Sequence, residues 1–287
     1  MKHLKINALA IAALSVSTIA EAQVDVSLFW KKDSVQIAEI ISDEAVQYRT
    51  VGHHGPAVEN QYMALRLYFN DSGAIDVYSK AKKGLELAEY HWYPTKEQIE
   101  AGAGCDEYRV GKTIGLGGFS LWDGEQEVKL VATRGREARV EKSGNKAKME
   151  MISRGVVYGT DTVDIAVTVS VSSKSRVATV EAKCISGQKV IFMTGVNYHD
   201  GQILDYGNGQ IAVWGIHPAD VVENPLPIGG GMRYKTSTWT SPEQTPDLLR
   251  IITKKKCKKA ATKVVAACSR ESEINSEAIF FNFVGKM

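Results

Sequence analysis

Short stretches in which apolar residues alternate with polar ones, separated by turn residues, recur along most of the chain. The clearest covers residues 162–172, where valines and one isoleucine occupy every second position from Val163 to Val171. Side chains on a strand point alternately to its two faces, so this segment predicts a strand that buries one side. Further runs rich in β-branched and aromatic residues predict strands at residues 35–41, 62–69, 127–133, 147–158, 177–182, 189–198, 211–214, 248–254 and 263–269.

Turn sequences between these runs indicate how the strands connect. Residues 70–73, 122–124 and 206–209 are rich in residues that favour tight turns. Residues 206–209 predict a hairpin tip, because Asn and Gly accept positive φ, and a hairpin pairs its strands antiparallel. Helical patterns are confined to residues 94–100 and 272–283. The sequence therefore predicts an all-β protein with large antiparallel sheets and a few short helices.

The first 22 residues have the features of a secretory signal peptide. Two lysines precede an apolar run at residues 6–20, and Ala20 and Ala22 occupy the positions that a signal peptidase reads. We expect cleavage before Gln23 and a periplasmic or secreted product. No later stretch reaches the roughly 20 apolar residues that span a bilayer, so we expect no membrane insertion. Residues 23–287 match the size of one large β domain.

The overall charge of the chain is close to balanced. It carries 35 basic and 33 acidic residues, which gives no whole-protein field that would attract nucleic acid, and an anionic partner would need a local basic patch. The four cysteines lack the paired spacing of a zinc site. In an oxidising compartment they are consistent with up to two disulfides, of which Cys257–Cys268 is the preferred pair.

The best candidate for chemistry is the segment 53–60 with the strand that follows it. His53 and His54 precede a Gly-Pro turn, a poor place for core residues, and Glu59 and Asn60 end the segment. In the next strand, alternation would aim Arg66 and its neighbours on the same face at an open side of the sheet, and so form a cleft. The alternative is that the histidines cap a loop and that Arg66 pairs with a surface acid.

Two further polar clusters follow. Residues 90–94 join His91 to aromatic rings at a strand end, where Trp92 would serve as a platform for the C–H face of a sugar. The alternative for Trp92 is an aromatic lid over the core. In residues 106–112, Tyr108 and Lys112 would share one face of an extended strand, although surface exposure alone also explains them.

Two strand ends later in the chain bring further histidines. Residues 197–200 end an apolar strand with Tyr198 and His199, and residues 216–220 place His217 near carboxylates. A histidine in such a loop is structural about half the time. Active sites assemble from distant loops on a rigid scaffold, so we expect these segments to meet on one concave sheet face.

Four segments also support a family resemblance. They read His-His-Gly-Pro-Ala-Val-Glu-Asn at 53–60, Arg-Leu-Tyr-Phe-Asn-Asp at 66–71, Ala-Ile-Asp-Val-Tyr-Ser-Lys at 74–80, and Asp-Glu-Tyr-Arg-Val-Gly-Lys-Thr-Ile-Gly-Leu-Gly-Gly at 106–118. With them the chain resembles the family catalogued as domain of unknown function 4861 over most of its mature length. The resemblance implies an exported bacterial protein, often found alongside glycan-degrading enzymes. It also implies a β-supersandwich similar to that of galactose mutarotases and several polysaccharide lyases. It transfers no catalytic residue.

Elimination on uronic-acid glycans, by a lyase that cleaves them or a dehydratase that removes water, suits these residue types. Removing the proton α to a carboxylate requires a group that neutralises the carboxylate, a base at C5 and an acid for the departing oxygen. Histidine suits the base, because its reference pKa is about 6.5. The residues assigned to these three roles are, in order, Arg66 and Asn60; His54 or His91; and Tyr93 or Tyr198.

The remaining candidates would complete the site. His199 joins the catalytic set and, with His217, would orient the sugar. The other substrate-binding candidates are His53, Glu59, Trp92, Tyr108 and Lys112. The expected partner is an oligosaccharide or polysaccharide, and an anionic one. No cofactor or metal is expected, although His and acid groups would suit Ca²⁺ or Zn²⁺ in a favourable geometry.

Two other functions fit the same residues. In a mutarotase or epimerase, Glu59 or Glu223 would take the proton of the anomeric hydroxyl and a histidine would protonate the ring oxygen. In a carbohydrate-binding module, the aromatic rings would bind glycan without catalysis. Nucleotide binding is not supported, because the glycine before Gly111-Lys112-Thr113 is misplaced for a phosphate loop. No carboxylate pair stands out for a retaining glycosidase.

Overall fold

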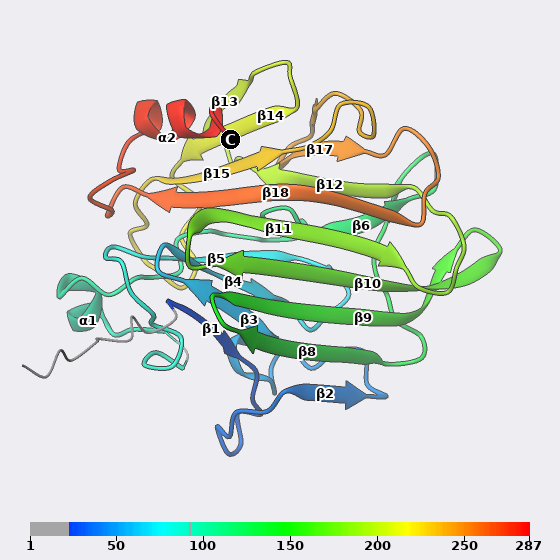
Figure 1. The fold of residues 1–287 in the computed structure, drawn as a ribbon, viewed down its shortest axis with the longest axis horizontal. Coiled ribbons are helices and arrows are strands. Elements are labelled where there is room, and N and C mark those ends of the chain that lie inside the picture. The colour runs from blue at the N-terminus through cyan, green and yellow to red at the C-terminus, as the bar shows by residue number, and fades with distance from the viewer. Residues whose placement is uncertain (1–22, 92) are drawn as a thin grey trace, which may run out of the picture.

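The structure is a computed structural model that describes residues 23–91 and 93–287. Nine strands form one antiparallel sheet, whose central strands lie in front in Figure 1. In order across the sheet they are β13 (Gln202–Asp205), β14 (Gln210–Gly215), β15 (Ile228–Arg233), β18 (Lys259–Cys268), β11 (Ser175–Cys184), β10 (Asp161–Ser172), β9 (Lys146–Tyr158), β8 (Arg136–Ser143) and β2 (Glu39–Ser42).

Two smaller antiparallel sheets form a second layer behind the first (Figure 1). One contains β1 (Val24–Ser27), β3 (Ala57–Asn60), β4 (Met63–Leu67) and β5 (Ile75–Ser79). The other contains β16 (Glu243–Gln244), β17 (Leu248–Ile252), β12 (Phe192–Asn197), β6 (Phe119–Trp122) and β7 (Glu127–Val128). The segment 105–117 joins them, because it pairs with β5 at Ile75 and Ser79 and bonds to β12 at Gly195.

The two layers enclose a continuous apolar core. β3 packs on β9 and β10, β5 packs on β18, and β12 packs on β15. The alternation predicted for residues 162–172 is confirmed: all five apolar side chains from Val163 to Val171 are buried in β10. They point into the space between the layers, where burial of apolar surface stabilises the sandwich. The prediction of an all-β antiparallel fold is confirmed.

Both predicted helices form, together with one short 3-10 helix. The three are η1 (Gly52–His54), α1 (Lys96–Glu100) and α2 (Glu277–Val284). Thr95 and Gln98 cap the start of α1, each bonding to the other's backbone N–H. α2 lies on β14 and β15 and buries Phe280 and Val284. Ile279 sits on the outer side of α2 and is 44% exposed.

The predicted open face of β4 is not open. The apolar residues of this strand face the core as predicted, but Ala64 and Arg66 on the opposite face are buried as well. The long loop after β5 covers them: Leu87 packs on Ala64, and Asp106 contacts Arg66. Only Tyr68, just beyond the strand, stays partly exposed. The cleft therefore forms further along this face than the sequence predicted.

The predicted disulfide between Cys257 and Cys268 is wrong. All four cysteines of the chain are free. Cys257 precedes the first residue of β18 and Cys268 is its last residue, so an extended strand places them about 30 Å apart. A disulfide requires Cα atoms within about 7 Å of each other.

Within residues 23–91 and 93–287, neither helix has the length and apolar character needed to cross a bilayer. The signal peptide predicted at residues 1–22 lies outside the described residues.

Candidate functional site

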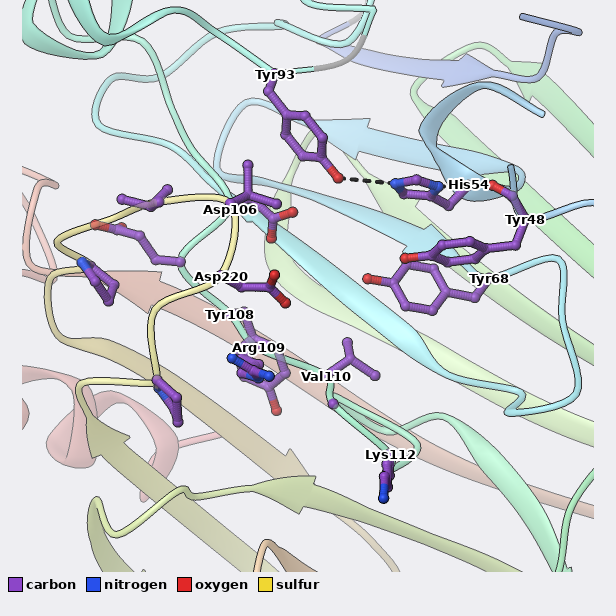
Figure 2. Close-up of a pocket in the computed structure, with 16 residues that line it drawn as sticks. Tyr48, His54, Tyr68, Tyr93, Asp106, Tyr108, Arg109, Val110, Lys112 and Asp220 are labelled. Atoms are coloured by element: carbon purple, nitrogen blue, oxygen red, sulfur yellow. Dashed lines mark hydrogen bonds between the residues drawn. The ribbon is translucent and has the colours of Figure 1, made fainter. Parts of the chain in front are cut away.

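A cavity of about 460 Å³ opens on the outer face of the small sheet that contains β4 and β5. Four separate stretches of chain contribute to its wall: residues 48–54, Tyr68, residues 93–112 and residues 218–225. Figure 2 shows how these side chains surround one space. The polar side chains among them are Tyr48, His54, Tyr68, Tyr93, Asp106, Glu107, Tyr108, Arg109, Lys112 and Asp220.

Tyr93 and His54 form a hydrogen-bonded pair on the wall of this cavity (Figure 2). Nε2 of His54 lies 3.0 Å from the Tyr93 hydroxyl, and Nδ1 lies 2.8 Å from the carbonyl oxygen of Tyr48. A carbonyl oxygen can only accept, so Nδ1 carries the proton and Nε2 accepts from Tyr93. The geometry therefore allows the phenol proton of Tyr93 to move onto His54.

The backbone holds the His54 ring in a fixed position. His54 has a φ of 62°, a left-handed conformation that few residues other than glycine adopt. The adjacent Gly55 allows the turn to lie against β4, because a Cβ there would be 2.0 Å from the carbonyl oxygen of Leu67. On the other side, the His54 imidazole stacks on the ring of Tyr48, with centroids 4.0 Å apart. Such strained backbone is common where a side chain must be oriented for function.

Burial keeps both members of the pair neutral at pH 7. Burial lowers the pKa of His54 to about 4, although the bond to the Tyr48 carbonyl acts in the opposite direction. Burial also raises the pKa of Tyr93 well above its usual value. The His54 ring is thus neutral over most of the pH range, and its Nε2 can accept a proton. Tyr93 keeps its own proton until such an acceptor takes it.

A buried ion cluster lies behind Tyr93. Arg66 binds Asp76 on the neighbouring strand and lies 2.6 Å from Asp106, whose side chain is 9% exposed and faces the cavity. Asp76 also accepts hydrogen bonds from the Tyr68 hydroxyl at 2.6 Å and from the backbone N–H of Val77 at 2.8 Å. Burial raises the pKa of Asp76 to about 7, against the opposing effect of Arg66. Burial likewise raises the pKa of Asp106.

The predicted role of Arg66 in neutralising a substrate carboxylate is wrong. Its guanidinium is fully buried and is taken up by Asp76 and Asp106. It is also 5.7 Å from the centre of the Tyr93 ring, so it supports that ring from behind. A substrate in the cavity would meet Asp106 and Tyr93 instead of Arg66.

Two other cations reach the cavity, Arg109 and Lys112. Within the described residues, neither has an ion-pair partner. Arg109 donates one hydrogen bond to the carbonyl oxygen of Ala219 at 2.7 Å, and Lys112 is exposed at the rim. Asp220, the residue after Ala219, lines the cavity as well (Figure 2). Two positive charges against one unpaired carboxylate favour an anionic ligand at this end of the cavity.

His199 and His217 lie beneath the cavity and position Arg109. Nδ1 of His217 accepts the backbone N–H of Arg109 at 3.0 Å, and Nε2 of His199 lies 2.7 Å from its carbonyl oxygen. Asn197 donates to the same carbonyl at 3.0 Å. Burial lowers the pKa of His217 to about 3, which keeps Nδ1 free to accept. Neither ring lines the cavity, so these histidines orient Arg109 and do not touch a ligand there.

Two further predicted site residues, both histidines, lie near this cavity without lining it. His53 is buried edge-on against Phe29, and His91 packs on the same phenylalanine with ring centroids 5.1 Å apart. Neither of them lines the cavity. Trp92 lies outside the described residues. His91 is thus separated from the proton-transfer pair, whereas Tyr108 and Lys112 both line the cavity.

Three predicted residues are committed to the fold. Glu59 is fully buried, binds Lys80 and accepts the backbone N–H groups of residues 86 and 87. Asn60 is fully buried and bonds to backbone groups on both sides. Tyr198 donates its hydroxyl to the carbonyl oxygen of Thr245 and does not line the cavity. The predicted substrate contacts of Glu59 and Asn60 are therefore wrong, because both side chains are buried. The predicted acid role of Tyr198 is also wrong, because its hydroxyl does not reach the cavity.

Several cavity residues were missing from the sequence prediction, among them Tyr48, Tyr68, Asp106 and Asp220. A signal existed for Tyr68, because it follows Arg66 by two positions and so shares its face. Asp76 pairs directly with Arg66 across β4 and β5, a register that the sequence leaves open. No sequence signal placed Asp220, since its loop has no regular structure. Among the described residues, no three His, Cys, Asp or Glu side chains are grouped to hold a metal ion.

The fold and the site define an all-β, two-layered antiparallel protein with a polar, tyrosine-rich cavity on one outer face. The chain belongs to the family described as Domain of unknown function (DUF4861), whose family model matches residues 2–287. The comparison with curated proteins gives no match.

One similar solved structure is the 4-alpha-glucanotransferase from Thermococcus litoralis, at 12% sequence identity and a TM-score of 0.35. The match covers 81% of this chain and 40% of the other chain, so this chain spans less than half of that enzyme. A likeness at this level carries no argument about activity.

Proposed function

We propose that this protein is an exported carbohydrate-active enzyme that cleaves uronic-acid-containing oligosaccharides by β-elimination. The observation that carries the proposal is the contact between Tyr93 and His54 on the wall of a cavity that also holds Arg109 and Lys112. Elimination requires proton transfer and neutralisation of one carboxylate, and it requires no pair of catalytic carboxylates.

Each step has a group of the right chemistry. Arg109 and Lys112 would bind the uronate carboxylate and so make the proton at C5 more acidic. The Tyr93 oxygen takes the C5 proton as its own proton passes to His54. The C5–H electrons form the C4=C5 double bond, and the bond from C4 to the glycosidic oxygen breaks. The departing oxygen takes a proton from Tyr93, which regains its proton from His54, so protons and electrons balance.

Arg66 and Asp106 would act on this reaction through Tyr93. Asp106 faces the cavity beside the phenol, and Arg66 lies behind both groups. The nearby guanidinium stabilises negative charge on the phenol oxygen, which offsets part of the effect of burial on Tyr93. In the mutarotase alternative, Glu59 is not available as the base, because its carboxylate is buried against Lys80.

The test is incubation of the purified protein with a panel of uronate oligosaccharides, followed by ultraviolet absorbance of unsaturated uronates. Absorbance that rises with enzyme concentration is the expected result. Binding of the same sugars with no new absorbance would support a carbohydrate-binding module, and a faster exchange of anomers in proton NMR would support a mutarotase.

Replacement of the exposed lysine at the rim should weaken substrate binding. We expect Lys112→Ala to raise KM for an acidic oligosaccharide about fivefold, the effect of losing about 1 kcal/mol from a partly solvated ion pair. The difference should shrink as salt is added, because the charge is exposed. Lys174→Ala, at the exposed turn between β10 and β11, is the matched control and should leave KM unchanged. An equal effect of both variants would argue against a carboxylate site at Lys112.

The acid limb of the pH–rate profile should reflect the low pKa of His54. Once protonated, His54 can no longer accept from Tyr93, so kcat/KM should fall as the pH drops through about 4. Above that pH the ring is neutral and activity is retained. Circular dichroism over the same pH range separates this loss from unfolding. An acid limb near 6.5, the ordinary pKa of histidine, would contradict the role given to His54.

A further inference from the structure

A second cavity of about 370 Å³ adjoins the first. The two share four lining residues: Tyr93, Asp106, Val221 and Val222. The proton-transfer tyrosine therefore stands at the junction of two chambers and not at the end of one. Each volume lies within the range that small-molecule sites have in proteins, and a single sugar would leave one chamber empty.

The two chambers differ in the charges that have no partner. The first holds Arg109 and Lys112 against Asp220. In the second, Arg270 is bound to Glu107 at 3.0 Å, and Lys96 lies 4.0 Å from Glu100. Among the described residues that line it, this leaves Glu223 as its unpaired charge. The first chamber thus favours an anion, whereas the second repels one.

The remaining wall of the second chamber suits an uncharged sugar. Pro94, Ile99, Val221 and Val222 provide an apolar surface for the C–H face of a pyranose ring, and Asn224 offers an amide to its hydroxyls. The short helix α1 carries Ile99 to this wall, and its capping box at Thr95 fixes where the helix starts.

We propose that the substrate is a mixed oligosaccharide, with an acidic sugar in the first chamber linked to a neutral sugar in the second, and with the scissile bond beside Tyr93 and Asp106. This inference rests on the proposed function for the identity of the reaction, but the two-chamber binding mode does not depend on it. In the elimination, the C4–O bond of the acidic sugar breaks. The acidic sugar keeps the new double bond, and the neutral sugar leaves from the second chamber with the oxygen and a proton.

Filling the second chamber tests the inference. In Ile99→Trp the larger ring occupies the space for the neutral sugar, and α1 is exposed enough to accept it. We expect affinity for a uronate–hexose disaccharide, measured by calorimetry, to fall at least tenfold. Affinity for the single uronic acid should stay unchanged. Ile279→Trp, on the exposed side of α2, is the matched control and should bind both sugars as the wild type does.

The charge in the second chamber should set the preference for a mixed substrate. The wild type should bind the uronate–hexose disaccharide at least tenfold more tightly than a uronate–uronate disaccharide, and Glu223→Gln should reduce this ratio severalfold. Equal affinities in the wild type, or no effect of Ile99→Trp, would overturn the inference. If binding follows these expectations but no unsaturated product forms, the proposed elimination fails and the two-chamber cleft stands. If unsaturated product forms equally from all uronates in the wild type and in Ile99→Trp, the proposed elimination stands and the two-chamber binding mode fails.

Discussion

Tyr93→Phe should reduce kcat on uronate oligosaccharides by about three orders of magnitude, within the range of 10²–10⁴ that a positioned acid–base group contributes. The substitution removes one oxygen atom and leaves the ring on Arg66 in place. It removes the hydroxyl that contacts His54 and that would contact the substrate in the proposed reaction, so neither proton transfer can proceed through the relay. The measurement is initial rate by ultraviolet absorbance, with KM obtained from the same curves.

Two further variants separate a chemical role from a structural one. His54→Gln keeps an amide that can bond to Tyr93 but removes the group that holds its proton, and it should lower kcat with little change in KM. Tyr198→Phe is the matched tyrosine control, because its hydroxyl bonds to the Thr245 carbonyl outside the cavity, and it should retain wild-type kcat. Turnover by Tyr93→Phe at the wild-type rate would remove this tyrosine from the mechanism.

The sequence predicted the architecture because the fold depends on strand periodicity. In β10, every second residue is apolar and faces the core, so the period alone identified both the strand and its buried side. The same argument failed for β4. Its polar face carries Arg66, and no pattern in the chain indicated that the loop after β5 would bury that face. Periodicity predicts which side is apolar, but it does not predict what covers the polar side.

The site was predictable only where neighbours in sequence are also neighbours in space. Residues 53–60 and 90–94 each contribute one member of the Tyr93–His54 pair, and both segments were identified by composition. Other residues of the first segment point elsewhere: His53 packs on Phe29, and Glu59 binds Lys80. Successive residues on a strand or tight turn face opposite directions, so composition located the segments but did not determine which side chain enters the cavity.

Arg66→Met should destabilise the protein by about 3–5 kcal/mol, the cost of removing one partner from a buried ion cluster. The substitution leaves Asp76 and Asp106 without the cation that compensates their charges. Asp76 is fully buried and Asp106 is only slightly exposed, so water cannot take the place of that cation. The loss should be largest above about pH 7, where the carboxylate is charged, and smaller in acid. The folded-state pKa of Asp76 is raised to about 7 even with Arg66 present, and without that cation it would rise further, so protonation relieves the buried charge. Urea unfolding at two pH values measures both effects.

Arg139→Met is the appropriate comparison, because Arg139 also bridges two carboxylates, Glu39 and Glu137, but is about half-exposed. Solvent screens that cluster, so its loss should cost less than about 1 kcal/mol. Adding Asp76→Asn and Asp106→Asn to Arg66→Met should restore part of the stability, since the amides carry no charge to bury. If Arg66→Met and Arg139→Met unfold at the same urea concentration, the Arg66 cluster is not a stabilising element. The support it gives Tyr93 would then have to come from packing alone.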